Sequence, residues 1–266
     1  MMKQQLSKYI LSAVLLPMLL CCSKKNNGPR GMASLTLINS VVGSSLLIPN
    51  FSGSYTLAGS YISGNFLTYG YYYGYAAGMN TGNQMTLQSG LQTLAMYQYP
   101  DTLPTSKPLL NIDFTLTAGS INSLFLTGTV NSPDTLLTVD HPPYYSVTDS
   151  SVGFRFVNLS PGSKPISVNI QGEPDGSRVS SLSYKNITGF SSFPAASGIS
   201  SYTFEFRDAA TGALLTSYLA DGINNDGSDP NNPANNWRFR NFTLALLGLP
   251  DGTGAEAQTV LLINNY

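Results

Sequence analysis

The sequence has few cysteines, and both of them lie near its start. The 266 residues include Cys21 and Cys22, and no cysteine follows them. A disulfide framework and a cysteine-ligated metal are therefore excluded for the rest of the chain. Charge is also scarce, because Asp, Glu, Lys and Arg make up 10% of the residues, against roughly 25% in an average soluble domain. Ser, Thr, Asn and Tyr supply most of the polarity instead, as is common in secreted β proteins.

Clustered cations and histidines, which many binding and catalytic sites need, are missing as well. The net charge is −1 and no basic stretch follows Lys24-Lys25, so the sequence argues against nucleic acid as a partner. The single histidine, His141, stands between Asp140 and Pro142, and no Gly-x-Ser-x-Gly elbow occurs. The acidic residues that a glycosidase would pair in its fold mostly stand in turn sequences. We therefore expect a protein that is not an enzyme.

The first residues indicate export. Lys3 and Lys8 precede an apolar run over residues 10–20, which is shorter than the ~20 residues that a membrane span needs. The end of this run resembles a bacterial lipobox, with Leu19 at the leucine position and Cys21 at the small-residue position, which makes Cys22 the lipidated cysteine. Cys21 is an imperfect match there, but Leu20 would be a worse one if Cys21 carried the lipid.

Lipidation of Cys22 predicts where the protein resides. We expect a signal peptide over residues 1–21 and a lipid-anchored polar tether over residues 22–32. The expected location is the outer membrane of a Gram-negative bacterium, and the basic Lys24-Lys25 leaves open whether the protein faces the periplasm or the cell surface. The alternative is an ordinary secretory signal peptide whose cysteines are incidental.

Beyond the tether, apolar and polar residues alternate with a period of two, which is typical of strands. The segments with this pattern are residues 34–38, 154–157, 167–170, 202–206 and 242–246. Clusters of Gly, Pro, Asn and Asp separate them and predict turns. Residues 88–96 allow a single helical turn at most. The pattern predicts an all-β protein built from two tandem immunoglobulin-like β-sandwich modules.

An internal repeat supports two modules. Residues 35–40 match residues 154–160 as alternating strands that contain an asparagine near their end, and residues 124–138 match residues 244–262. Residues 139–151 contain two prolines, which a central strand does not accommodate, and therefore indicate a linker. We expect the modules to span residues 33–138 and 152–266.

The segment Arg155-Phe-Val-Asn-x-Ser-Pro161 resembles the opening of a repeat family of domains of unknown function in bacterial envelope lipoproteins. The second unit resembles the family best, and the first departs from it with Asn39-Ser-Val-Val in place of Asn-x-Ser-Pro. The resemblance implies two β-sandwich modules on a lipid anchor. It implies no active site, because the family has no established biochemical activity.

The segment Tyr69-Gly-Tyr-Tyr-Tyr-Gly-Tyr75 is the most unusual in the chain. On a strand, Tyr69, Tyr71, Tyr73 and Tyr75 would share one face. A row of tyrosine rings can stack on sugars or receive a partner protein. The same row can instead cover a half-buried core, because tyrosine favours strands on its own account.

The single tryptophan, Trp237, allows the same two interpretations. If its ring faces the core, Arg238 and Arg240 would form a basic outer face on the same strand.

A loop over residues 221–232 offers the best candidate for a metal site. Asp221, Asn224, Asp226 and Asp229 carry hard oxygen ligands at short spacing, which Ca²⁺ accepts. The loop does not fit the EF-hand template, and its composition is also that of an ordinary surface loop. We otherwise expect no cofactor.

Two functions fit these patterns. The first is a non-catalytic binding or adhesion module of the cell envelope, held to the membrane by its lipid and directed at a glycan or a protein. The alternative is a structural or accessory subunit that scaffolds other envelope proteins.

Overall fold

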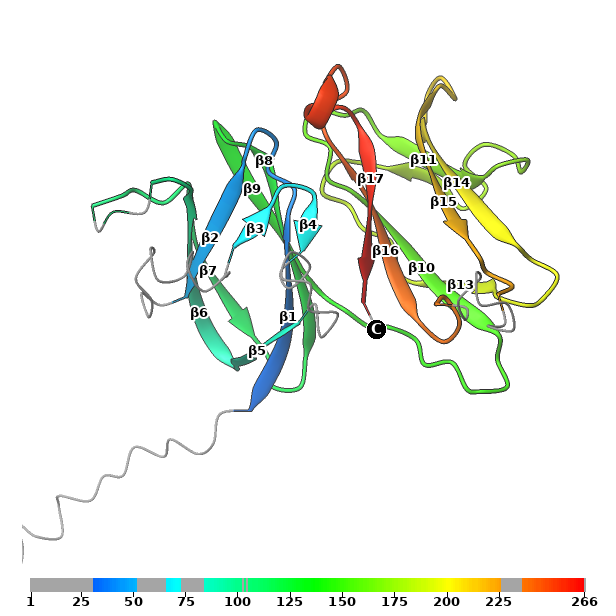
Figure 1. Ribbon diagram of the computed structural model, residues 1–266, viewed down its shortest axis with the longest axis horizontal. Helices are drawn as coiled ribbons and strands as arrows, with labels where there is room; N and C mark the ends of the chain where they lie inside the picture. Colours follow the sequence, from blue (N-terminus) through cyan, green and yellow to red (C-terminus); the bar gives the residue numbers. More distant parts are fainter. Residues whose placement is uncertain are drawn as a thin grey trace, which may run out of the picture.

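The computed structural model describes residues 31–51, 66–72, 84–101, 103, 105–225 and 236–265. The fold is all-β, as the sequence predicts, and no α-helix occurs in these ranges. The chain forms two β-sandwiches that lie side by side (Figure 1). Cys22 lies outside the described residues.

The first sandwich consists of two sheets. One has the strand order β4-β1-β8-β9, with β5 also paired to β1, and the other has the order β3-β2-β6-β7. β1 and β8 are parallel, although most neighbours in the sandwich are antiparallel. The strands are β1 (Met32–Asn39), β2 (Leu46–Phe51), β3 (Leu67–Thr68), β4 (Tyr71–Tyr72), β5 (Met85–Gln88), β6 (Gly90–Gln98), β7 (Leu110–Leu116), β8 (Ile121–Thr129) and β9 (Ser132–Val139).

The second sandwich has the corresponding strand orders, β13-β10-β16-β17 and β12-β11-β14-β15. Its parallel pair is β10 with β16. The elements are β10 (Ser151–Asn158), β11 (Ile166–Ile170), β12 (Val179–Leu182), β13 (Ser191–Pro194), β14 (Ser201–Asp208), β15 (Leu214–Asp221), β16 (Asn241–Leu247), the 3-10 helix η2 (Gly254–Glu256) and β17 (Thr259–Asn264).

All five segments predicted from alternation are strands, within β1, β10, β11, β14 and β16. The helical turn allowed for residues 88–96 does not form, because this segment ends β5 and makes up most of β6. Only Ser89 separates the two strands, and Gly90, which begins β6, has a φ of 109°, a conformation that favours glycine. The chain can therefore leave β5 and start β6 in the other sheet without a helix.

Each sandwich encloses its own apolar core. Leu35, Leu37 and Leu47 lie in the first core, and Phe154, Phe156 and Phe204 in the second, all at most 2% exposed. The phenylalanine rings of the second core pack edge to face, with 4.8 Å between the centroids of Phe154 and Phe204. Burial of this apolar area supplies the main stabilisation of each sandwich.

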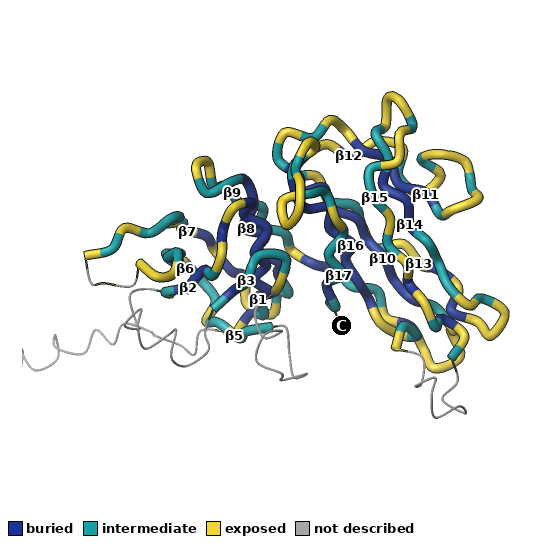
Figure 2. The backbone as a smooth tube through the Cα atoms, turned by 45° about the horizontal axis from the view of Figure 1, so that its top comes forward, coloured by how far each residue is buried: buried dark blue, intermediate teal, exposed yellow. Residues whose placement is uncertain are grey.

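The facing sheets of the two sandwiches are buried on both sides. The strands β1, β8, β10 and β16 contain almost no exposed residue (Figure 2). Along β10, Phe154 and Phe156 enter the second core, while Arg155 and Val157 point to the opposite side, toward the first sandwich. The four sheets therefore form four layers with three interiors between them.

The asparagines that end β1 and β10 make the same hydrogen bonds. Asn39 accepts the backbone N–H of Val41 at 3.0 Å and its amide donates to Ser44 Oγ at 3.0 Å. Asn158 accepts the N–H of Ser160 at 3.1 Å and donates to Ser163 Oγ at 3.0 Å. Each amide also donates to a carbonyl on a neighbouring strand, that of Leu67 on β3 or Leu182 on β12. Both asparagines are fully buried, so each one fixes the turn that carries the chain from one sheet to the other.

Replacing Asn158 by alanine is expected to lower the free energy of unfolding by about 2 kcal/mol, because the N–H of Ser160 and the carbonyl of Leu182 lose a buried partner. Urea denaturation would measure the loss. The exposed Asn111 on β7 provides the control, since its alanine variant should stay within about 0.5 kcal/mol of the parent. Equal stabilities of the two variants would contradict the role given to Asn158.

Candidate functional site

A buried polar network joins the two sandwiches. Arg155 on β10 and Asp140, which follows β9, form an ion pair with 2.6 Å between Nη1 and Oδ1. They are 3% and 4% exposed. Asp140 also accepts hydrogen bonds from Ser123 Oγ at 2.6 Å and Thr138 Oγ1 at 2.8 Å. Arg155 Nε donates to Thr243 Oγ1 on β16 at 2.7 Å, so both charged groups have several partners.

Apolar side chains surround this network. They form a third cluster, with Ile38, Phe125 and Leu136 from the first sandwich and Val157, Leu159, Ile187, Ala245, Leu247, Leu261 and Ile263 from the second. A buried ion pair keeps its strength only where water is excluded, and this cluster excludes it. The Arg155 guanidinium also lies 4.6 Å from the centre of the Phe190 ring.

β8 and β10 run in the same direction across this contact. Arg155 Nη2 donates to Ser123 Oγ at 3.2 Å, and Thr127 Oγ1 donates to the Leu159 carbonyl at 3.0 Å. In each pair, the residue of the second sandwich follows its partner by 32 positions. Because this offset is the same in both pairs, β8 and β10 are parallel and stay in one register. The ends at which β8 and β10 begin therefore lie at the same end of the molecule.

The connection between the sandwiches, expected to be a linker over residues 139–151, is packed at two points. Asp140 is 4% exposed and Tyr145 is 7% exposed. Asn241 Nδ2 donates to the Pro143 carbonyl at 2.9 Å, which attaches the connection to the start of β16. The prolines keep the segment out of the sheets, but its contacts hold it against the second sandwich.

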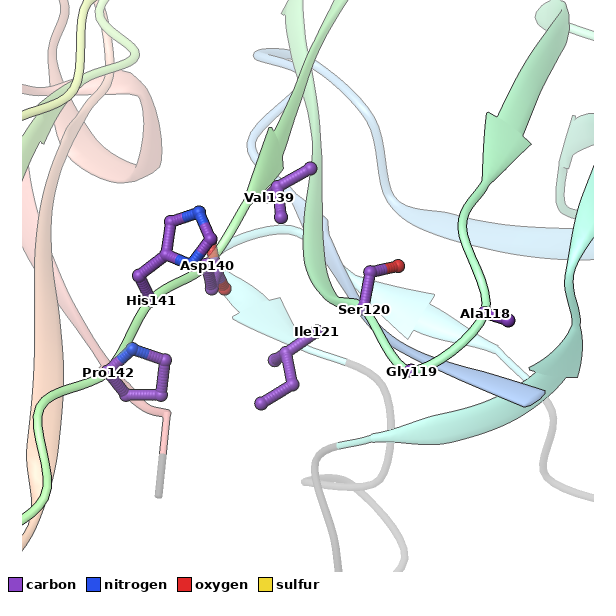
Figure 3. A pocket seen from close by; sticks show the side chains of 8 residues that line it. All are labelled: Ala118, Gly119, Ser120, Ile121, Val139, Asp140, His141 and Pro142. Atoms are coloured by element: carbon purple, nitrogen blue, oxygen red, sulfur yellow. The ribbon is translucent and has the colours of Figure 1, made fainter. Parts of the chain in front are cut away.

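A shallow pocket of about 510 Å³ lies beside this connection (Figure 3). It is lined by Ala118, Gly119, Ser120, Ile121, Val139, Asp140, His141 and Pro142. His141 is exposed. Both carboxylate oxygens of Asp140 already bind Arg155, Ser123 and Thr138, so this carboxylate is committed to the contact between the sandwiches.

The tyrosine row does not form one strand face over its described part. Tyr69 and Gly70 form a turn between β3 and β4, and Gly70 has a φ of 72°. Only Tyr71 and Tyr72 belong to β4, and Tyr73 and Tyr75 lie outside the described residues. Tyr69 and Tyr71 therefore do not alternate along a single strand, which corrects the geometry on which a row of rings depends.

Tyr69 instead faces the second sandwich. Burial raises the pKa of its hydroxyl, the Gly248 backbone lowers this pKa, and the Glu256 carboxylate raises it, with burial the largest effect. The neighbouring Gly70 lies close to Leu247, whose Cδ1 is 3.9 Å from the place a β-carbon would take. Tyr71 is 40% exposed. The two tyrosines thus have different surroundings.

Trp237 lies in the turn before β16 rather than on a strand. Its ring centroid is 4.9 Å from that of Phe242 and 5.8 Å from that of Phe154, so it covers the edge of the second core. Its Nε1 donates to the Asp221 carbonyl at 2.6 Å. The interpretation of a core-facing ring fits these contacts, whereas the strand face with Arg238 and Arg240 does not exist.

The predicted calcium loop is described in part. Asp221 ends β15 and its carboxylate accepts the N–H of Gly222 at 2.9 Å, and Asn224 is exposed. Asp226 and Asp229 lie outside the described residues. Within the described ranges no three His, Cys, Asp or Glu side chains gather as a metal site would require.

A second cleft, of about 400 Å³, lies at the opposite end of the second sandwich from the start of β10. It is lined by Gly162, Ser163, Lys164, Asp208, Leu215, Pro250, Asp251 and Gln258. The N–H groups of Thr211 and Ala210 hold the pKa of Asp208 below its usual range, and Lys164 adds a smaller effect. This cleft, which we call the distal cleft, offers an ammonium group, carboxylates and an amide to a polar ligand.

Sequence reasoning missed both the contact between the sandwiches and the distal cleft. Ser123, Arg155 and Thr243 point to the strand face that is turned away from the core of their own sandwich, and polar residues on this face normally meet water. The signal for the contact is the continuous apolar runs over residues 124–126 and 244–247, which are typical of strands buried on both faces. The distal cleft combines three loops that are far apart in the sequence, and no local pattern marks it.

Comparison with known proteins gives little further guidance. No protein-family model matches the chain, and no curated protein matches it. Among solved structures, a leucine-rich repeat protein from Bacteroides thetaiotaomicron aligns at 11% identity and a TM-score of 0.14, over 72% of this chain and 24% of its own length. The chain thus spans about a quarter of that protein. None of the described residues forms a helix with the length and apolarity needed to cross a membrane.

Proposed function

We propose that this chain is an envelope lipoprotein, anchored through Cys22, whose two sandwiches form one rigid, non-catalytic binding body for a glycan or a protein. The observation that carries this proposal is the sealed contact between the sandwiches, with the buried pair of Arg155 and Asp140 inside an apolar cluster. A ligand that binds such a body meets loops that are already ordered, which lowers the entropy lost on binding.

The distal cleft is the site that we propose for the ligand. It lies at the end of the second sandwich where β10 ends, whereas the described chain enters the fold at the start of β1 (Figure 1). An anchored protein would therefore direct this cleft away from its membrane. Lys164, Asp208 and Gln258 supply hydrogen-bond donors and acceptors of the kind that hydroxyl-rich sugars and peptide side chains bind.

The matching strand orders and the shared bonds of Asn39 and Asn158 support our proposal that the sandwiches are repeats of one module. The distal cleft is built from loops of the second module. The second sandwich would then bind the ligand, while the first sandwich separates the second from the lipid anchor.

The second candidate function is a structural or accessory subunit. The packing of Tyr69 against the second sandwich favours it, since this tyrosine serves the contact between the sandwiches rather than a ligand. A purely structural protein would copurify with an envelope partner through a surface other than the distal cleft.

The double variant Lys164→Glu and Asp251→Lys is expected to reduce ligand capture at least ten-fold, because it exchanges the charges on two sides of the distal cleft. A ten-fold loss corresponds to ~1.4 kcal/mol. Capture is measured on a glycan array and by cross-linking in intact cells, with mass spectrometry of the captured proteins.

The control variant is Lys107→Glu, which changes an exposed lysine of the first sandwich. It should bind as the parent does. Equal capture by the double variant and the parent would remove the distal cleft as the site. If the parent captures a protein whose binding the double variant leaves intact, the structural function is favoured instead.

A further inference from the structure

The tether meets the fold at a defined end of the molecule. Gly31 precedes β1, and the N–H of Gly119 donates to the Met32 carbonyl at 2.8 Å, so the turn before β8 lies beside it. β8 and β10 begin at the same end, as their register shows. Figure 1 shows the start of β1 and the connection between the sandwiches along one side of the molecule. We call this the anchor-side end.

Exposed apolar side chains gather at the anchor-side end. Of the eleven large apolar residues that are exposed in the described part of the chain, six lie here: Met32, Leu91, Val139, Tyr144, Val147 and Phe239. Tyr144 and Val147, on the connection, are 89% and 86% exposed. Phe239, in the turn before β16, is 42% exposed. Their exposure costs solvation free energy unless something other than water covers them.

Phe239 adds an independent observation. Its φ is 63°, in the left-handed region where bulky side chains are rare and glycine or asparagine is favoured. The turn is held by the N–H of Phe239, which donates to the Ser151 carbonyl at 2.8 Å, and by that of Arg240, which donates to the Trp237 carbonyl at 3.2 Å. None of these bonds uses the phenylalanine ring. The ring is thus both exposed and costly to place, which indicates a role outside the fold.

The turn of Phe239 and the connection form one surface. Asn241 Nδ2 donates to the Pro143 carbonyl at 2.9 Å, which brings the start of β16 against the segment that carries Tyr144. Arg238 and Arg240 are the cations of this surface, and Asp149 and Asp221 are its described exposed anions. Tyr144, Val147 and Phe239 offer apolar and aromatic contact to whatever this surface binds.

The length of the tether between Cys22 and Gly31 limits how far the anchor-side end can lie from the membrane. Gly31 follows Cys22 by nine positions, and a fully extended chain spans at most about 3.5 Å per residue. The anchor-side end of a protein lipidated at Cys22 is therefore confined to within about 30 Å of the bilayer. Tyrosine and phenylalanine with flanking arginine are residues that settle at the boundary between headgroups and acyl chains.

We infer that the anchor-side end docks on the lipid surface through Tyr144, Val147 and Phe239, and so holds the protein upright with its distal cleft away from the membrane. This inference rests on the proposed anchor at Cys22. A lipid on Cys22 limits the distance between the fold and the bilayer but does not by itself set the orientation of the protein. The apolar contact fixes its orientation.

The test uses the lipidated protein, purified from membranes and reconstituted into vesicles of phosphatidylcholine and phosphatidylglycerol. Single cysteines replace Tyr144, Phe239 or, as the distal control, Leu214, which is 52% exposed and lies at the end of β15 remote from the anchor. Each carries an environment-sensitive fluorophore, and lipids with a spin label on the headgroup quench it. We expect at least three-fold stronger quenching at positions 144 and 239 than at position 214. Equal quenching would overturn the inference.

A further variant separates lipid contact from mere closeness to the anchor. Phe239→Gly removes the ring and suits the positive φ, so its thermal midpoint should equal or exceed that of the parent. Quenching of a label at position 144 should fall at least two-fold in this background. Unchanged quenching, or a lowered thermal midpoint, would contradict a role of the ring in lipid contact. Mass spectrometry of the N-terminus reports acylation separately, so a failure of the anchor is distinguished from a failure of docking.

Discussion

Replacing Arg155 by alanine is expected to lower the free energy of unfolding by about 3–5 kcal/mol, because it leaves the Asp140 carboxylate buried without its counter-charge. Ser123 and Thr138 would still donate to this carboxylate, but neutral hydroxyls do not replace a guanidinium. Thr243 would lose a donor as well. Urea denaturation followed by tryptophan fluorescence, which reports the second sandwich through Trp237, would measure the effect.

Two further variants test whether the loss of stability arises because the unpaired Asp140 carboxylate is buried. The double variant Arg155→Met and Asp140→Leu removes both charges and should recover most of the lost stability, because apolar replacement of a buried ion pair is often neutral. Arg178→Ala breaks the partly exposed pair of Arg178 and Glu173, and the expected loss is at most about 1 kcal/mol. If Arg155→Ala cost no more than Arg178→Ala, the network would not hold the sandwiches together.

Substituting Cys22 by serine is expected to abolish fatty acylation completely. The proposed anchor requires a sulfur nucleophile at this position, and a serine hydroxyl is a far weaker one. Each methylene of an acyl chain contributes ~0.8 kcal/mol to membrane affinity. Metabolic labelling with a fatty-acid analogue, together with mass spectrometry of the mature N-terminus, would measure the loss.

Cys21→Gly is the matched control, since it changes the neighbouring cysteine and provides the small residue that a lipobox prefers. Label should be retained and the mature chain should begin at position 22. A parent protein that takes up no label and has an unmodified N-terminus would refute the anchor, and with it the proposed location.

The sequence predicts the strands well because their signal is local. In β10 and β14, phenylalanines alternate with other residues, and the side chains of a strand point alternately to its two faces, so the pattern alone determines which face enters the core. The hydrogen bonds that end β1 and β10 are also local in sequence, since Asn39 and Asn158 each bind the residues two and five positions ahead. The all-β fold follows from these features.

The contact between the sandwiches could not be predicted in the same way. A polar residue between two apolar ones, such as Arg155 between Phe154 and Phe156, has the same pattern whether water or a second sheet lies opposite. Only the partner, Asp140, distinguishes the two cases, and it stands in a proline-containing segment that reads as a linker. The tyrosine segment failed for a different reason, because Gly70 takes a positive φ and forms a turn where alternation predicted a continuous strand.

The parallel pairing of β1 with β8, and of β10 with β16, joins strands that are far apart in the chain. Arg155 and its partner Thr243 are 88 positions apart, as are Ser34 and its partner Asn122. A polypeptide that emerges N-terminus first, from a ribosome or from a translocation channel, exposes the opening strand of each unit long before its closing strand arrives. Such distant pairings make assembly slow and leave apolar edges open to aggregation in the meantime. We therefore expect this protein to depend on a holding chaperone during biogenesis.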